Sequence, residues 1–235
     1  MFLTTFGSEG TGNGQLSWPS GLDIDSAGNI YVSDSNNNRI QKFTSDGTFL
    51  MKWGSTGSGN GQFDTPGTLA LDAAGNVYVA DRHNHRIQKF TGDGVYLYSW
   101  GSYGTGEGQL NDPYAVHVSS KGEVYVADTL NHRIQKFTHD GRFMESWGSQ
   151  GSGDGQLNMP TDVTVDGAGN VNVADRNNNR IVVFLAGGTR TYRVSVSSTG
   201  QQPNGLTSYS SISPDGRFVA FDSHASNLVD EDTNN

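Results

Sequence analysis

Two histidines stand two positions apart in the stretch ADRHNHRIQKF (80–90), with an aspartate before them and an arginine after. On a β-strand, residues two apart point to the same face. His83 and His85 could therefore bind one metal ion, or form a catalytic cluster with Asp81. A plain turn is the third possibility, because Asp and Asn side chains hydrogen-bond to the backbone nearby. The rest of the chain has to decide between the three.

One segment of the chain recurs at a fixed interval of 47 residues. Residues 31–43 (YVSDSNNNRIQKF), 78–90, 125–137 and 172–184 (NVADRNNNRIVVF) align without a gap. Each copy holds an aspartate five positions before an arginine. These predicted turn pairs are Asp34–Arg39, Asp81–Arg86, Asp128–Arg133 and Asp175–Arg180. A strict period of this length is typical of folds in which each unit packs on its neighbours.

Each unit predicts four short antiparallel strands. In the first unit they are GLDID (21–25), IYVSD (30–34), RIQKF (39–43) and FLMKW (49–53), separated by turns rich in Asp, Asn and Gly. Four antiparallel strands per unit make the blade of a β-propeller, so we predict an all-β propeller of four blades and a partial fifth. Because one blade cannot bury both of its faces, the apolar columns should lie in the seams between blades.

The amino-acid sequence of the repeat resembles that of a known family. Residues 61–94 (GQFDTPGTLALDAAGNVYVADRHNHRIQKFTGDG) resemble an NHL repeat, the blade of a class of six-bladed propellers, and the resemblance covers residues 1–188. The blades expected from it are residues 10–56, 57–103, 104–150 and 151–188. Residues 213–223 (SPDGRFVAFDS) resemble a TolB-type propeller repeat. We therefore predict that 189–235 form a partial blade and a polar tail of the same propeller.

The two ends of the chain predict an imperfect ring. Residues 2–10 (FLTTFGSEG) align with 49–57 (FLMKWGSTG), which predicts a fourth strand without the rest of its blade. The partial fifth blade stops after two strands. We expect an incomplete six-bladed ring or a fragment of one, with a five-bladed ring that holds one defective blade as the alternative. An open seam would leave an apolar sheet face exposed.

The composition argues against several function classes. The chain has 235 residues, 32 glycines and no cysteine, so disulfides and thiolate metal sites are excluded. The formal net charge of -9 disfavours nucleic acid as the main partner, because an acidic surface repels phosphates. No apolar run approaches the ~20 residues of a membrane helix and no signal peptide is visible, so we expect no membrane insertion. Motifs for phosphate loops, nucleophile elbows, zinc helices and EF-hands are lacking.

The repeat also decides between the interpretations of the two histidines. His85 aligns with His132, but also with Asn38 and Asn179, and a position that accepts Asn is no obligate metal ligand. We therefore predict a turn in which Asp and Arg pair across the base, braced by the Asn between them. His83 varies between the units and is predicted to be a surface residue at a loop tip, where binding groups also occur.

Positions that differ between the units are the candidates for binding, because the shared positions build the blade. The first strand of each unit lines the central channel, and the loops after the shared aspartates reach the same rim. The candidate ligand site is therefore a funnel formed by Asp23, Arg82, His83, Tyr114, His117, Asp162 and Arg176. No cofactor is predicted, with Ca²⁺ or Zn²⁺ held through Asp23 or Asp162 as an alternative. A solvated channel mouth without any ligand is the other alternative.

The resemblance to NHL propellers implies a sensor or scaffold role. We predict a monomeric, non-catalytic binding module for a protein, peptide or glycan ligand. The TolB-like residues favour a bacterial protein outside the cytoplasm. Some NHL-like propellers are metal-dependent lyases or hydrolases with histidines in the channel, and here only His117 lies in a channel-facing column. Others bind RNA through a basic rim, for which Arg82 and Arg176 are the candidates.

Overall fold

The computed structural model describes residues 5–186, 191–193, 207–212 and 219–223, which form strands and three 3-10 helices of one turn each. The first blade consists of β1 (Pro19–Ile24), β2 (Ile30–Asp34), β3 (Arg39–Phe43) and β4 (Phe49–Trp53), and the second of β5 (Pro66–Leu71), β6 (Val77–Asp81), β7 (Arg86–Phe90) and β8 (Tyr96–Trp100). The third consists of β9 (Pro113–Val118), β10 (Val124–Asp128), β11 (Arg133–Phe137) and β12 (Phe143–Trp147). The fourth consists of β13 (Pro160–Val165), β14 (Val171–Asp175), β15 (Arg180–Phe184) and β16 (Thr191–Arg193). The short helices are η1 (Ser35–Asn37), η2 (Thr129–Asn131) and η3 (Arg176–Asn178).

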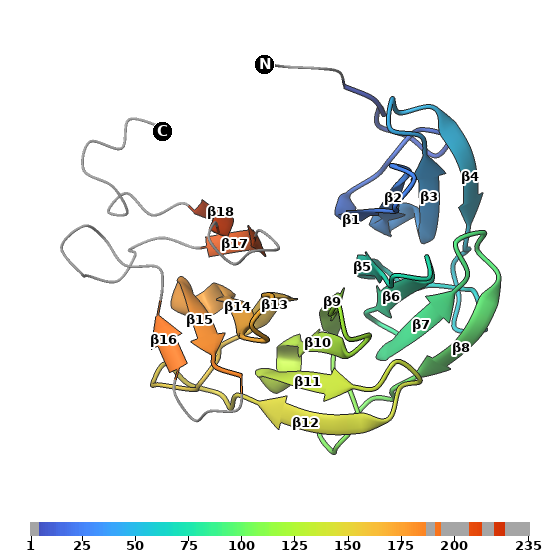
Figure 1. Cartoon of the computed structure of the whole chain (residues 1–235). Helices are drawn as coiled ribbons and strands as arrows, with labels where there is room; N and C mark the ends of the chain where they lie inside the picture. Colours follow the sequence, from blue (N-terminus) through green and yellow to red (C-terminus); the bar gives the residue numbers. More distant parts are fainter. Residues whose placement is uncertain (1–4, 187–190, 194–206, 213–218, 224–235) are drawn as a thin grey trace, which may run out of the picture.

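The four blades stand side by side along an arc. In each blade the strands pair antiparallel in the order of the sequence. The first strands of successive blades, β1, β5, β9 and β13, lie on the inner side of the arc and contact each other, while β4, β8 and β12 lie on the outside (Figure 1). The predicted all-β propeller of four-stranded antiparallel blades is confirmed.

The turn between the first two strands of a blade follows directly from its residue types. In the first blade, Asp25 Oδ1 accepts hydrogen bonds from the backbone N–H of Ala27 and Asn29, at 3.0 and 2.8 Å. The Asn29 amide donates to the other carboxylate oxygen at 2.9 Å. Gly28 has φ +84°, a conformation that glycine adopts without the strain a side chain would cause. The turn therefore fixes the register of β1 against β2.

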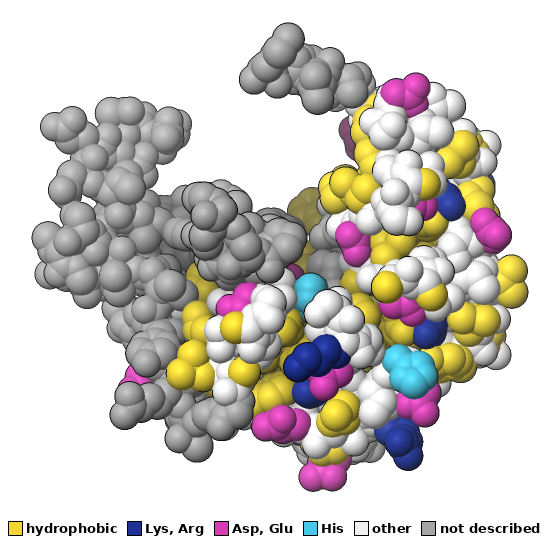
Figure 2. Space-filling model, viewed as in Figure 1, with side chains coloured by type: hydrophobic (Ala, Val, Ile, Leu, Met, Phe, Trp, Pro, Cys, Tyr) yellow, Lys and Arg dark blue, Asp and Glu magenta, His cyan; other side chains and the backbone are white. Residues whose placement is uncertain are grey.

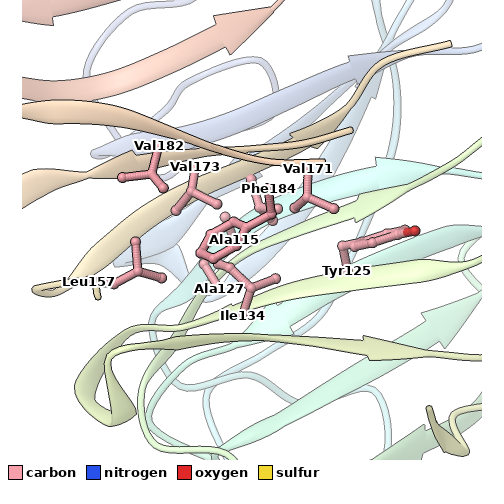
Figure 3. Close-up of a cluster of buried hydrophobic side chains, with 10 residues drawn as sticks. Ala115, Tyr125, Ala127, Ile134, Leu157, Val171, Val173, Val182 and Phe184 are labelled. Atoms are coloured by element: carbon pink, nitrogen blue, oxygen red, sulfur yellow. The ribbon is translucent and has the colours of Figure 1, made fainter. Parts of the chain in front are cut away.

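The hydrophobic core is divided among the seams between blades. Each seam has its own cluster of buried side chains, and Figure 3 shows the one that joins the third blade to the fourth, where Ile134 and Leu157 meet Val173 and Val182. An aromatic pair of the repeat crosses each seam, such as Trp53 with Phe90. A fully buried side chain of this size contributes about 1.5–3 kcal/mol, so the seams supply much of the stability.

The first blade leaves an apolar face uncovered. Leu22 of β1 is 64% exposed, whereas its equivalents in the next three blades, Leu69, Val116 and Val163, are 4%, 5% and 2% exposed because the preceding blade covers them. Ile24 on the same strand is 55% exposed. The apolar face expected at an open seam is therefore present on the first blade.

Part of the chain after the fourth blade lies outside the described residues. Two strands are described there, β17 (Thr207–Ile212) and β18 (Val219–Ser223); they pair antiparallel, and β17 contacts β13 and β14. The assignment of 189–235 to a TolB-type repeat falls mostly on residues that are not described and stays a prediction. Within the described ranges, no helix has the length and apolar character needed to cross a membrane.

Truncation of the same repeat position should affect stability differently in a covered blade and in the uncovered first blade. Leu69→Ala should lower the free energy of unfolding by about 2–5 kcal/mol, because it leaves a cavity in a covered seam. Leu22→Ala, the same change at the exposed equivalent, should stay within about 0.5 kcal/mol of the unchanged protein. Urea unfolding of both variants measures the difference. Equal losses would contradict the uncovered face on the first blade.

Candidate functional site

The inner strands of the four blades line an open hollow of about 470 Å³. Three of the predicted site residues, Asp23, His117 and Asp162, line it from β1, β9 and β13. They come from three blades and lie on one concave wall, together with the small polar side chains of Ser20, Thr68, Thr161 and Thr164. A hollow of this size accommodates a small ligand or one side chain of a larger partner.

The Asp23 carboxylate already holds two backbone groups. Its Oδ1 accepts a hydrogen bond from the N–H of Ile24, and its Oδ2 accepts one from the N–H of Leu71 on β5, both at 2.8 Å. The Thr68 hydroxyl accepts the N–H of Val116 on β9 at 3.0 Å in a similar manner. Side chains on the channel wall thus bridge neighbouring inner strands. Asp23 therefore has a structural role in the wall, whether or not it also binds a ligand.

Asp162 is also tied to its own strand. One of its oxygens accepts the N–H of Val163 at 2.9 Å. Among the described residues, no group of three or more His, Cys, Asp or Glu side chains is arranged to hold a metal ion. The Ca²⁺ or Zn²⁺ alternative therefore lacks an assembled ligand set in the part of the chain that the structure describes.

The fold alters the ionisation of His117 on this wall. Its imidazole makes no hydrogen bond or ion pair with a described residue, and burial lowers its pKa from 6.5 to about 4. The ring is therefore neutral at physiological pH, with one nitrogen that donates and one that accepts. It is suited to hydrogen-bond an uncharged polar group of a ligand.

The predicted arginine of the second blade is held at the rim by a neighbouring blade. The Arg82 guanidinium forms two hydrogen bonds of 3.0 Å to the Asp112 carboxylate and lies 4.5 Å from the centre of the Tyr114 ring. Sequence reasoning missed Asp112, although it stands in a column that varies as Trp18, Thr65, Asp112 and Met159. The three side chains form a platform that joins the second blade to the third.

The two remaining predicted residues lie on the rim loops and do not line the hollow. His83 Nδ1 is 3.2 Å from Asp64 Oδ1, and both side chains are half exposed. Arg176 is the first residue of η3, is half-buried, and has no ion pair with a described residue. The structure thus divides the predicted funnel into a wall of three residues and separate rim positions.

The shared turn is organised around a buried carboxylate. In the second blade, Asp81 is fully buried, and its Oδ1 accepts the N–H of Asp64 at 2.9 Å and the Asn84 amide at 3.0 Å. Its Oδ2 accepts hydrogen bonds from Arg86 Nε at 2.8 Å and Gln88 Nε2 at 2.9 Å. The equivalent ion pairs are Arg39–Asp34 at 2.6 Å, Arg133–Asp128 at 2.7 Å and Arg180–Asp175 at 2.7 Å.

The structure also explains why the turn accepts either His or Asn. His85 and Asn38 have φ of +54° and +50°, the left-handed conformation that Asn and His adopt more readily than most residues. His85 Nδ1 accepts the N–H of Asp112 at 3.1 Å, and Asn38 Oδ1 accepts the N–H of Thr65 at 2.7 Å. Each side chain therefore offers one acceptor to the connector of the next blade.

A protein-family model described as NHL repeat matches one stretch in each blade, residues 16–43, 63–90, 110–137 and 157–184. Protein lin-41 of Caenorhabditis elegans is 46% identical over 48 residues, which is 20% of this chain and 4% of lin-41. E3 ubiquitin-protein ligase TRIM71 of Mus musculus is 51% identical over 45 residues, 19% of this chain and 5% of that protein. The chain thus matches a small part of the length of these curated relatives.

Solved structures resemble the chain over most of its length. Virginiamycin B lyase from Staphylococcus aureus superposes with a TM-score of 0.59 at 15% identity, over 87% of this chain and 69% of the lyase chain. A protein of unknown function from Bacteroides caccae superposes with a TM-score of 0.62 at 17% identity, over 83% of this chain and 67% of that chain. At such low identity the likeness shows the fold alone.

The buried carboxylate predicts a large effect of a small substitution. Asp81→Asn should lower the free energy of unfolding by about 3 kcal/mol, because it leaves the Arg86 cation without its counter-charge. Asp93→Asn, at an exposed turn of the same blade, is the matched control and should stay within about 0.5 kcal/mol. Urea unfolding decides, and an equal effect of the two changes would contradict the role given to Asp81.

The lowered pKa of His117 predicts a pH dependence of stability. The unfolded chain takes up a proton near pH 6.5 while the folded ring stays neutral down to about pH 4. Its contribution is therefore fully present above pH 6.5 and is lost as the pH falls toward 4. Between pH 7 and 4.5 the melting temperature of His117→Gln should fall less than that of the unchanged protein. His139→Gln, at an exposed position, should behave like the unchanged protein; identical curves for all three would refute the assignment.

Proposed function

We propose that this chain, which belongs to the NHL-repeat family of β-propellers, is a non-catalytic binding module that holds its ligand in the hollow between the inner strands. The observation that carries the proposal is the wall itself. His117 is kept neutral and has no described partner, and it faces a hollow lined by small polar side chains. Such a wall is suited to recognition by hydrogen bonds and shape.

The hydrogen bonds of the two carboxylates favour a ligand-binding module over a metal-dependent enzyme. Asp23 and Asp162 accept hydrogen bonds from backbone N–H groups. Both carboxylates therefore act in part as braces of the inner strands, which leaves His117 and the threonine hydroxyls as the groups that would meet a ligand.

The charge of the module selects the class of ligand. With a net charge of -9, the chain favours a neutral or basic ligand, and a protein, a peptide or a glycan suits it better than nucleic acid. On the face shown in Figure 2, the Lys and Arg side chains are few and stand beside acidic ones. Arg82, a candidate for a basic rim, is neutralised by Asp112.

A second candidate function is a lyase that acts from the same hollow. Two observations favour it: the fold likeness to virginiamycin B lyase over 87% of the chain, and a neutral histidine on the wall. One solved form of that lyase is a catalytically inactive histidine-to-alanine variant with quinupristin. Quinupristin is therefore the probe to use for this alternative.

The predicted bacterial origin and extracytoplasmic location find no support in the curated relatives named above, which are animal proteins. Both stay predictions, as does the monomeric state. RNA binding is the third function to be tested, because a rim arginine, Arg176, has no described counter-charge.

The binding proposal predicts that filling the hollow abolishes recognition. Thr164→Arg should remove binding to ligands selected by the unchanged protein from a random heptapeptide library and a glycan array, because the new side chain occupies the hollow. Thr48→Arg adds the same charge at an exposed outer turn and should leave binding intact. Retained binding in Thr164→Arg, or no selected ligand at all, would overturn the proposal.

The same samples separate the alternatives. Loss of quinupristin in the presence of the unchanged protein, abolished by His117→Ala, would establish the lyase in place of the binding module. Association with single-stranded RNA that weakens steeply with salt would instead identify an electrostatic RNA binder.

A further inference from the structure

One repeated hydrogen bond closes each of the first two seams. It lies at the end of the strands where the turn joins the first strand of a blade to the second. The Tyr31 hydroxyl lies 3.3 Å from Asp25 Oδ2 of its own turn and 3.3 Å from the carbonyl oxygen of Gly92 in the next blade. The Tyr78 hydroxyl likewise lies 3.2 Å from Asp72 Oδ2 of its own turn and 3.4 Å from the carbonyl oxygen of His139 in the next blade. In both seams the tyrosine stands edge-on to the tryptophan of its own blade, at 74° and 77°.

The third seam departs from this pattern. Like Tyr31 and Tyr78, Tyr125 contacts a carboxylate of its own turn, here Glu123 at 3.1 Å. Unlike them, it has no hydrogen bond to a described residue of the fourth blade. Its ring lies flat against Trp147, with an interplanar angle of 11°. A groove of about 510 Å³ opens here, lined on the far side by Val171, Phe184 and neighbouring residues. We call it the seam groove; it lies at the end of the strands away from the rim loops.

The residues that distinguish the third blade from the others converge on the seam groove. Where the other blades have Ala27, Ala74 and Ala168, the third has Lys121. Where they have Asn29, Asn76 and Asn170, it has Glu123, and Glu145 stands where β4 has Met51. Lys121, Glu123 and Glu145 all line the groove. Lys121 and Glu123 belong to one turn and Glu145 to β12, so departures from the repeat in two separate elements meet at the groove.

The charges of the groove are incompletely paired. Lys136 forms an ion pair of 2.8 Å with Glu123, so these two charges satisfy each other. Lys121 and Glu145 form no ion pair within 4.0 Å of a described residue, although Lys121 is near enough to Glu123 to help lower the pKa of that carboxyl, and Glu145 stands opposite Lys136 in the pairing of β11 with β12. The groove therefore offers a flat aromatic pair and apolar walls together with one available cation and one available anion.

We infer that the seam groove binds a small zwitterionic aromatic molecule, of the class of a free aromatic amino acid. The aromatic ring lies against the apolar part of the groove, which is lined by Trp147, Val171 and Phe184. The carboxylate pairs with Lys121 and the ammonium pairs with Glu145. The volume of the groove falls in the range of small-molecule sites, which supports a compact ligand.

The closed seams supply a control that is built into the chain. Lys121→Ala and Glu145→Met restore residues that other blades carry at the same positions, so both variants should fold. Ala74→Lys places a lysine at the matching turn of the second blade, where the seam is closed. Thr164→Arg blocks the central hollow and tests whether the two sites are independent.

Three indole compounds test separately the pairing of the ligand carboxylate with Lys121 and of the ligand ammonium with Glu145. Tryptophan carries both charges, tryptamine lacks the carboxylate, and indole-3-propionate lacks the ammonium. By isothermal titration, Lys121→Ala should weaken tryptophan about tenfold, corresponding to about 1.4 kcal/mol, and leave tryptamine unchanged. Glu145→Met should weaken tryptophan by a similar factor and leave indole-3-propionate unchanged. Ala74→Lys and Thr164→Arg should not alter any of the three.

Two results would overturn the inference. One is the lack of saturable tryptophan binding by the unchanged protein at concentrations on the order of 1 mM. The other is binding that Lys121→Ala and Glu145→Met leave intact, or weaken equally for all three probes. Because Thr164→Arg closes only the central hollow, failure of the proposed function leaves this test unaffected.

Discussion

The buried carboxylate of the repeat is the interaction on which the rest of the propeller depends. Each of Asp34, Asp81, Asp128 and Asp175 is fully buried. A buried carboxylate is tolerated only when donors satisfy it, and each one holds a backbone N–H of the connector that enters its blade, an Asn and an Arg. The arginine in turn donates to connector carbonyls, as Arg86 does to Gly59 and Gln62. One side chain thereby fixes the hairpin, the connector and the position of the blade.

The features that the sequence could predict are those that depend on residues within one repeat unit. Strands, turns and Asp–Arg pairs depend on residues within one unit, and four copies of the unit make their pattern visible. The alignment of Asn38 and Asn179 with His85 was enough to predict a turn position that is no obligate metal ligand. The reason that both residue types fit, an acceptor for the connector N–H in a left-handed backbone, needed coordinates because that N–H belongs to a residue 27 positions later.

The apolar seams between blades were predicted, but the polar contacts that join one blade to the next could not be. Arg82 was expected to be available for a ligand, and Asp112, thirty positions on, takes both of its hydrogen bonds. Asp23 was expected in the channel, and the structure places it there, with the N–H of Leu71 on its carboxylate. A repeat shows which columns vary, but it does not show which variable residue of one unit meets which variable residue of the next.

The third seam shows how a repeat fold can gain a site without losing its frame. The hydrogen bond that Tyr125 does not make across the seam is worth about 1 kcal/mol net. The core of that seam keeps Ile134, Leu157 and Val173, all buried, so far more stabilisation is retained than is given up. Substitutions at the turn can therefore open a groove at the edge of a seam while the buried carboxylates hold the blades in place. Seams, as well as the central channel, are where a propeller can acquire new binding sites.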